Sequence, residues 1–167
     1  MRENRTIYAA YGSNMNTGQM TDRCPQARVM GVAEIEGYRL LFRGQNGAAV
    51  ATIEPAAGRR VPVVLWSITA DDEGALDWYE GAPRLYRKER LTIKDRDSGM
   101  SVRAMVYVMN DRYGTATPDA GYFKGISDAY KEFGFDIRDL AAAVFESANH
   151  AAPGRQSAQG RLPLASY

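Results

Sequence analysis

The stretch that decides the fold of this chain is Tyr8-Ala9-Ala10-Tyr11-Gly12-Ser13-Asn14-Met15. Residues 6–11 have the pattern of a short strand, and the pattern breaks at Gly12 into a Gly-Ser-Asn turn. A turn of this kind can direct several backbone N–H groups towards one point, which is how proteins hold a carboxylate or an oxyanion. The stretch therefore predicts an anion-binding turn directly after the first strand.

A second stretch, Leu76-Asp77-Trp78-Tyr79-Glu80-Gly81, has the pattern of a helix end. Thr69 and Asp72 form a capping signal at the start of this helix, and Gly81 stands where a C-terminal cap is usual. The helix thus ends on the carboxylate of Glu80. An anion-binding turn combined with one carboxylate indicates chemistry on a small polar substrate.

Length and composition favour one soluble globular domain. The chain has 167 residues, of which 45% are hydrophobic and 25% charged, and we assign residues 1–148 to the domain and 149–167 to a loosely held tail. The net charge of +1 suggests neither a nucleic-acid nor a membrane partner. With one cysteine and no signal-peptide pattern at the N-terminus, we expect a cytoplasmic protein. The oligomeric state stays open.

Seven segments have strand character, and turns at Gly37, at residues 44–47 and at residues 55–58, which end in Gly58, separate those in the first half of the chain. These candidate strands cover residues 6–11, 29–35, 38–43, 48–53, 61–68, 86–94 and 101–109. Four helices are expected, over residues 17–23, 70–80, 118–133 and 137–148, the third with Pro118 at its first position. Many strands covered by few helices predict an α+β fold, with a mixed sheet curled towards a barrel and a few peripheral helices.

Several motifs together resemble those of the gamma-glutamylcyclotransferase-like superfamily, which includes the AIG2-like proteins. Residues 11–15 match the family signature YGSN[LM], and residues 76–81 match L-D-x-x-E-G. Residues 23–27 are similar to its R-x-P-x-A step, and residues 49–53 to its G-x-A-T-I strand, with Ala49 in place of the glycine. The likeness runs from about residue 6 to residue 140 in the same order along the chain.

This resemblance implies the superfamily's fold, a β-barrel-like core with peripheral helices, and a reaction. The family's enzymes split γ-glutamyl amides into 5-oxoproline and a free amine or amino acid. The α-amine of the glutamyl group attacks its own γ-carbonyl, so the reaction needs no cofactor, metal or protein nucleophile. The enzyme must instead fold the substrate, move protons and stabilise an oxyanion.

By position, the acid/base implied by the resemblance is Glu80. A free glutamate with a pKa of ~4.3 is a poor base for an ammonium group. The helix C-terminus, the nearby charge of Asp77 and the aromatic neighbours Trp78, Tyr79 and Tyr86 are all expected to raise the pKa of Glu80. By spacing alone, an exposed helix-end carboxylate without function is the simpler interpretation, and the family match reverses that preference.

Substrate binding is assigned to the turn and to three tyrosines. The candidate binding residues are Tyr11, Gly12, Ser13, Asn14, Met15, Tyr86, Tyr107 and Tyr122. The turn amides are expected to hold either the α-carboxylate of the substrate or the oxyanion. Half-buried structural aromatics are the alternative for each tyrosine, and a plain capped turn is the alternative for residues 12–15.

Other residues are given structural roles. Cys24 has no histidine nearby, and Ser13 lacks a G-x-S-x-G context, so neither is expected to be a nucleophile. Arg43 ends a strand beside a glycine-rich loop and is interpreted as solvated rather than carboxylate-binding. No metal site is expected, because the chain has one cysteine and one histidine.

Two alternatives to a general γ-glutamyl cyclotransferase stay open. One is an enzyme of the same type that acts on γ-glutamylamines or on a γ-glutamylated natural product. The other is a small-molecule binding protein that has kept the site and lost turnover. Loops 45–48 and 113–118 are expected to shape substrate choice.

Overall fold

The computed structural model describes residues 3–149, and within them five strands form a closed barrel. The strands are β1 (Thr6–Ala10), β2 (Arg28–Arg43), β3 (Val50–Ile68), β4 (Tyr86–Asp95) and β5 (Ser101–Met109). Their order around the barrel is β1-β3-β2-β4-β5, and every neighbouring pair is antiparallel except β1 and β5. Those two strands are parallel and meet at Tyr8 and Met105, which closes the barrel.

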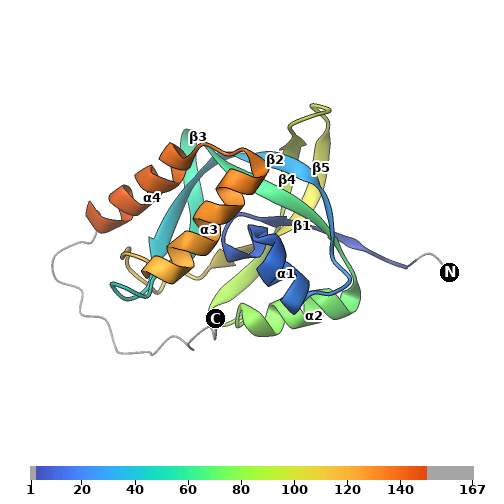
Figure 1. The fold of residues 1–167 in the computed structure, drawn as a ribbon, viewed down its shortest axis with the longest axis horizontal. Helices are drawn as coiled ribbons and strands as arrows, with labels where there is room; N and C mark the ends of the chain where they lie inside the picture. The colour runs from blue at the N-terminus through green and yellow to red at the C-terminus, as the bar shows by residue number, and fades with distance from the viewer. Residues whose placement is uncertain (1–2, 150–167) are drawn as a thin grey trace.

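Helices cover the barrel in two groups (Figure 1). The helices are η1 (Ser13–Met15), α1 (Thr17–Arg23), α2 (Ala70–Tyr79), α3 (Ala120–Phe133) and α4 (Ile137–Asn149). α1 packs beside α2 near one end of the barrel, whereas α4 packs on β2 and also contacts α3. The expected α+β fold with a barrel-like core and peripheral helices is therefore confirmed.

Two long strands replace four of the predicted short ones. β2 and β3 run side by side with a register shift between Glu36 and Tyr38, opposite the irregular segment between Pro55 and Arg60. Gly37 and Gly58, which we interpreted as turn residues that end strands, have φ of 77° and 76° and lie inside this irregularity. Glycine at positive φ allows a β-bulge, so these positions bend a continuous strand pair instead of interrupting it.

The start of α3 is also a correction. Asp119, rather than Thr117, is the N-cap, and its carboxylate accepts a hydrogen bond from the amide of Tyr122 at 2.8 Å. Pro118 therefore precedes the cap and is not the first helical residue. Thr117 is unable to begin the helix because its carbonyl accepts from the amides of Gly47 and Ala49 at 2.9 and 3.2 Å.

The same contacts join the two loops assigned to substrate choice. The amide of Gly44 also donates to the carbonyl of Gly114 at 3.0 Å, so loops 44–49 and 113–118 lie together at one end of β2 and β3. The expected tail, residues 149–167, falls outside the described residues except for Asn149, which ends α4. Within residues 3–149, no helix has the length and apolar character needed to cross a membrane.

Candidate active site

The turn after β1 is built as the sequence predicts. Its first internal hydrogen bond runs from the amide of Met15 to the carbonyl of Gly12 at 3.1 Å, so the amides of Ser13 and Asn14 have no partner inside the turn. Asn16 then caps α1 by accepting from the amide of Gln19 at 3.1 Å. The N–H groups of this turn are therefore available as donors to an anion.

Met15 itself contributes little to this donor set. Its amide is used within the turn, and its side chain is fully buried in the core. Gly12, by contrast, is closely packed: a Cβ at this position would lie 3.2 Å from the Cβ of Ala51 and 3.5 Å from the hydroxyl of Tyr122. We define the amide turn as Gly12, Ser13 and Asn14.

Glu80 is brought to the amide turn by the end of α2. The helix begins with the predicted capping box of Thr69 and Asp72, Glu80 is its C-cap residue, and Gly81 follows at φ 62°. The side-chain amide of Asn14 donates to Oε1 of Glu80 at 3.0 Å, across 66 positions of sequence. The two stretches that the sequence singles out are thus in direct contact.

The environment of Glu80 raises its pKa to about 7. The cause is burial of the carboxylate, which disfavours the charged form; the charge of Arg23 and the hydrogen bond from Asn14 act in the opposite direction. The raised pKa agrees with the sequence-based expectation, although two of the expected causes are absent. Asp77 is directed to the hydroxyl of Tyr107 and to Lys88, at 2.6 and 2.8 Å, and Trp78 is 85% exposed.

A cluster of buried tyrosines includes four on which the charge of Glu80 acts, Tyr8, Tyr11, Tyr86 and Tyr107. The members are Tyr8, Tyr11, Tyr86, Tyr107 and Tyr122. Burial, followed by further causes that include the charge of Glu80, holds the pKa of Tyr8, Tyr11 and Tyr86 well above the usual value for a phenol. Burial and the hydrogen bond to Asp77 do the same for Tyr107. Tyr8, Tyr11, Tyr86 and Tyr107 therefore stay neutral at physiological pH.

The hydroxyls of the predicted tyrosines are used to hold the protein together. Tyr11 donates to the backbone carbonyl of Tyr107, and the hydroxyl of Tyr107 donates to Asp77. Tyr86 donates to the carbonyl of Ala51 at 2.6 Å, and Tyr122 accepts from the amide of Ala51 at 3.0 Å. β3 is therefore clamped at Ala51 through both the amide and the carbonyl of that residue.

The clamp lies at the side of β3 that has no neighbouring strand at this point. β1 pairs with β3 over residues 64–68 only, and the amide and carbonyl of Phe42, the β2 partner of Ala51, are bonded elsewhere, to Ser147 and Ala116. Ala51 thus directs its polar backbone groups away from β2. The hydroxyls of Tyr86 and Tyr122 satisfy them in place of a strand.

Tyr8, Arg23 and Ala51 contact the predicted site residues, and sequence reasoning assigned none of them a role. Tyr8 accepts from the side-chain amide of Asn14 at 3.0 Å, and Arg23 donates to Oδ1 of Asn14 at 2.6 Å. Tyr8 belongs to the opening stretch, and Arg23 belongs to the R-x-P-x-A motif. Ala51, which contributes through its backbone, belongs to the strand motif of residues 49–53, so the motifs contained a signal for both Arg23 and Ala51.

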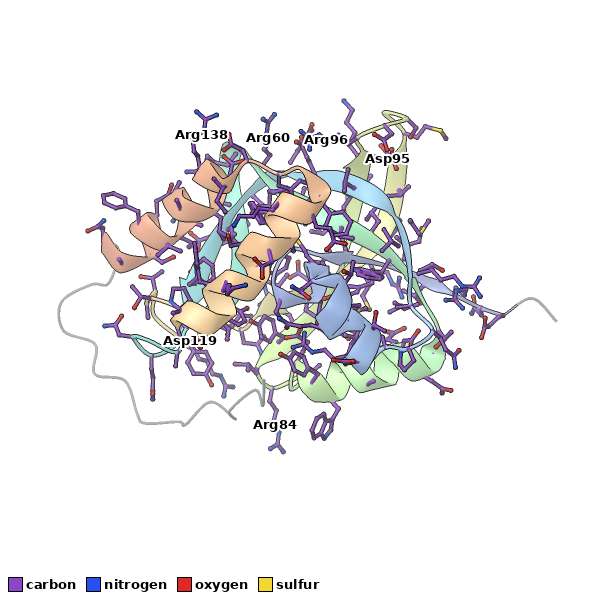
Figure 2. All side chains as sticks on the ribbon, in the orientation of Figure 1. Arg60, Arg84, Asp95, Arg96, Asp119 and Arg138 are labelled. Carbon is purple, nitrogen blue, oxygen red and sulfur yellow. The ribbon has the colours of Figure 1, made fainter. Side chains whose placement is uncertain are left out.

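Cys24 keeps its structural role, whereas the interpretation of Arg43 as solvated is wrong. Cys24 is buried, and burial raises the pKa of its thiol to about 12, which leaves it protonated and unreactive. Arg43 is paired with Glu54 rather than solvated. Arg84 points into solvent beyond the C-terminal end of α2, as Figure 2 shows. Within residues 3–149, no group of three or more His, Cys, Asp or Glu side chains is placed to hold a metal ion.

Comparison with known proteins gives one consistent result. A family model described as "Gamma-glutamyl cyclotransferase, AIG2-like" matches residues 8–125. The gamma-glutamylcyclotransferase of Homo sapiens is 28% identical over 143 residues, which cover 81% of this chain and 75% of the human protein. That of Mus musculus is 29% identical over 136 residues, covering 77% and 71% of the two chains.

A solved structure of a gamma-glutamyl cyclotransferase has the same fold, with a TM-score of 0.76 at 24% identity over 93% of each chain. The residues matched by the family model include both the amide turn and Glu80. The resemblance seen in the sequence motifs is confirmed, and the chain belongs to the gamma-glutamyl cyclotransferase, AIG2-like family.

Proposed function

We propose that the protein is a γ-glutamyl cyclotransferase, which converts a γ-glutamyl amide into 5-oxoproline and a free amine or amino acid. The observation that carries this proposal is the contact between the amide turn and Glu80, a half-buried carboxylate with a pKa of about 7. A carboxylate titrating near neutral pH can both take up and release a proton under working conditions. A cytoplasmic location is in keeping with the reduced thiol of Cys24.

In the proposed reaction Glu80 removes a proton from the α-ammonium group of the substrate. The amine nitrogen then attacks the γ-carbonyl carbon, and a C–N bond forms as the carbonyl oxygen becomes an oxyanion. Collapse of this intermediate breaks the bond to the leaving amine, which is protonated by the Glu80 carboxylic acid. Of the three ammonium protons, one stays on the lactam nitrogen. Glu80 carries the other two in turn to the leaving nitrogen, which departs as an ammonium group.

The other groups around Glu80 have complementary chemistry. The amides of Ser13 and Asn14, which have no partner inside the turn, are donors suited either to the α-carboxylate or to the oxyanion. Tyr86 spends its single O–H on the carbonyl of Ala51, so its oxygen can only accept a further hydrogen bond. An acceptor beside a proton-accepting carboxylate favours the α-ammonium group of the substrate.

The test is formation of 5-oxoproline from a panel of γ-glutamyl amino acids and γ-glutamyl amines, including isopeptide-linked lysine, detected by mass spectrometry. We expect turnover of at least one compound, and a loss of about 10²- to 10⁴-fold in kcat for Glu80→Gln, which keeps the shape and removes the base. Glu36→Gln, at an exposed position on β2, is the matched control and should retain full activity. The panel also separates amino-acid from amine substrates.

The pH dependence provides a second readout of the same assignment. Because the ionised form of Glu80 is needed first, kcat/KM should decrease as the pH is lowered past the pKa of Glu80, which is about 7. Full activity in Glu80→Gln contradicts the role of Glu80. The same conclusion follows if the decrease of kcat/KM at acidic pH keeps its position in a variant whose Glu80 side chain is more exposed to solvent. Absence of 5-oxoproline with every panel member favours the binding-protein alternative.

A further inference from the structure

Arg23 sits at the centre of a hydrogen-bond network beside Glu80. Its Nη1 donates to Oδ1 of Asn14 at 2.6 Å and to the hydroxyl of Ser13 at 3.3 Å. Its Nη2 donates to Oε1 of Gln19 at 2.9 Å and to the hydroxyl of Tyr79 at 2.7 Å. The guanidinium carbon also lies 3.8 Å from the centre of the Tyr79 ring. The guanidinium is therefore fixed by α1 and by the end of α2 together.

This network decides which way the side-chain amide of Asn14 faces. A guanidinium group can only donate, so the Asn14 atom beside it must be the oxygen. The Nδ2 group then faces the other way, where its two hydrogens go to the hydroxyl of Tyr8 and to Oε1 of Glu80, each at 3.0 Å. All three polar partners of Asn14 agree on one orientation.

The orientation makes the two carboxylate oxygens of Glu80 different. Oε1 is held by Asn14, whereas no donor to Oε2 is found among residues 3–149. A carboxylate that moves protons needs one oxygen available to the substrate and a fixed plane in which that oxygen lies. Asn14 supplies the fixed plane, and Oε2 is left for the proton.

We propose that Arg23 is a positioning residue, which acts through the amide of Asn14 to fix the carboxylate plane of Glu80 and leave Oε2 as the proton-transfer oxygen. The inference rests on the proposed cyclotransferase function for its kinetic consequence, but its structural consequence can be measured without turnover. Arg23 touches neither the substrate nor the reacting atoms in this assignment. The charge of Arg23 also lowers the pKa of Glu80 directly. It is therefore the positional effect, measured with that charge retained, that must disappear when the side chain of Asn14 is removed.

A double-mutant cycle tests this dependence. Arg23→Lys keeps the positive charge but loses the planar fork that holds Asn14. We expect Arg23→Lys and Asn14→Ala each to lower kcat by about 10- to 100-fold with little change in KM. The double variant should be no slower than Asn14→Ala alone. Arg39→Lys, which alters an arginine paired with Glu54 on the far side of β2 and β3, is the matched control and should keep the activity of the wild type.

The second readout is the pKa of Glu80, followed by ¹³C NMR of its side-chain carboxyl group and assigned with Glu80→Gln. Loss of the Asn14 hydrogen bond removes a group that favours the ionised form, so this pKa should rise in both single variants and rise no further in the double variant. If Arg23→Lys fails to fold, Tyr79→Phe replaces it, because it retains the stacked ring and removes one anchor of the guanidinium.

The proposal is overturned if the losses in the single variants multiply in the double variant, or if Arg23→Lys leaves both kcat and the pKa of Glu80 unchanged. The two readouts also separate the failures of the two proposals. No 5-oxoproline from the wild type with a coupled pKa response rejects the cyclotransferase function and retains the positioning role. If the wild type forms 5-oxoproline but the effects of the Arg23 and Asn14 substitutions are independent, the cyclotransferase function is retained and the positioning role is rejected.

Discussion

The half-buried carboxylate of Glu80 makes the stability of the folded protein depend on pH. Its pKa is about 7 when folded and 4.5 in the reference state, so between these values the folded protein binds a proton that the unfolded chain releases. Because the unfolded state then holds fewer protons, the free energy of unfolding decreases as pH rises from about 4.5 to 7. Above that range the folded protein carries the full cost of an ionised buried group.

Glu80→Gln should therefore stabilise the protein at alkaline pH. The expected gain in the free energy of unfolding is up to about 3 kcal/mol at pH ~8.5 and close to zero at pH ~4.5. Urea unfolding at the two pH values measures it, with the acidic value as the internal control. An equal change at both values would mean that burial does not raise the pKa of Glu80 in solution.

Gly12 tests the packing of the amide turn. In Gly12→Ala the new methyl group meets the Cβ of Ala51 at 3.2 Å, and Ala51 has no freedom to retreat because its peptide groups are bonded to Tyr86 and Tyr122. We expect a loss of about 1–3 kcal/mol in unfolding free energy together with reduced turnover.

The control for Gly12→Ala is Gly74→Ala. Gly74 lies inside α2 with open space around its Cβ position. By helix propensity this second substitution should stabilise the protein by about 0.5–1 kcal/mol. Thermal unfolding compares the two variants, and a Gly12→Ala protein as stable and active as the wild type would argue against a closely packed turn.

At this scale the motifs singled out Glu80 and the amide turn, and the structure places Asn14 of the turn in contact with Glu80. They give the direction of the Glu80 pKa but not its cause, because burial depends on segments that arrive from elsewhere in the chain. Asp77 illustrates the limit. It is one helical turn from Glu80 in sequence, yet it is drawn to Lys88 and Tyr107 on neighbouring strands.

At the scale of elements, the two ends of α2 differ in role: the first holds the helix in place and the last positions Glu80. Its first residues are held by the capping box, in which the amide of Asp72 donates to the Thr69 hydroxyl at 3.1 Å and the amide of Thr69 donates to Asp72 at 3.0 Å. At its other end the C-cap residue, Glu80, contacts the amide turn through Asn14. A helix of 10 residues spans about 15 Å, so the two ends are well separated.

Thr69→Ala should reduce stability without reducing catalysis. Loss of the cap is expected to cost about 1 kcal/mol of unfolding free energy, whereas kcat measured well below the melting temperature should not change. Thr69→Ser, which retains the hydroxyl, is the matched control in chemical denaturation and in the 5-oxoproline assay. A fall in kcat like that of Glu80→Gln would show that the start of α2 also positions the site.

Local signals placed α1, α2 and β5 well because their caps and turns lie within a few residues. They were wrong for β2 and β3, where Gly37 and Gly58 were interpreted as strand ends. A glycine at positive φ has the same sequence appearance in a turn and in a bulge, and only the partner strand distinguishes them. Pro118 was misplaced for a similar reason, since the loop at Gly47 and Ala49 holds Thr117.

At the scale of the whole molecule, β3 is the central strand. Over residues 64–68 it pairs with β1 on one side, and β2 covers most of the same residues on the other. Closure between β1 and β5, in contrast, has a single registered pair, Tyr8 with Met105. The barrel could be anticipated as a class from its strand-rich composition, but a parallel contact between the first and last strands leaves no local signal.

Hydrogen exchange should follow this difference. Amides of β3 near Leu65 are expected to exchange only through global unfolding, whereas those at the tip of the β4–β5 hairpin, residues 95–101, should exchange through local opening. Native-state exchange in increasing low concentrations of urea distinguishes the two classes. Equal protection at both places would contradict a central role for β3.

The clamp at Ala51 has a consequence for solubility. A strand edge with unpaired backbone groups is a template on which another chain can add a strand and begin to aggregate. Tyr86 and Tyr122 occupy that edge with two phenol oxygens, so the residues nearest the site also close it to intermolecular β-sheet growth. Replacing both tyrosines to widen the site would therefore leave the backbone groups of β3 at Ala51 unpaired. Loss of soluble protein through aggregation would then accompany any change in substrate range.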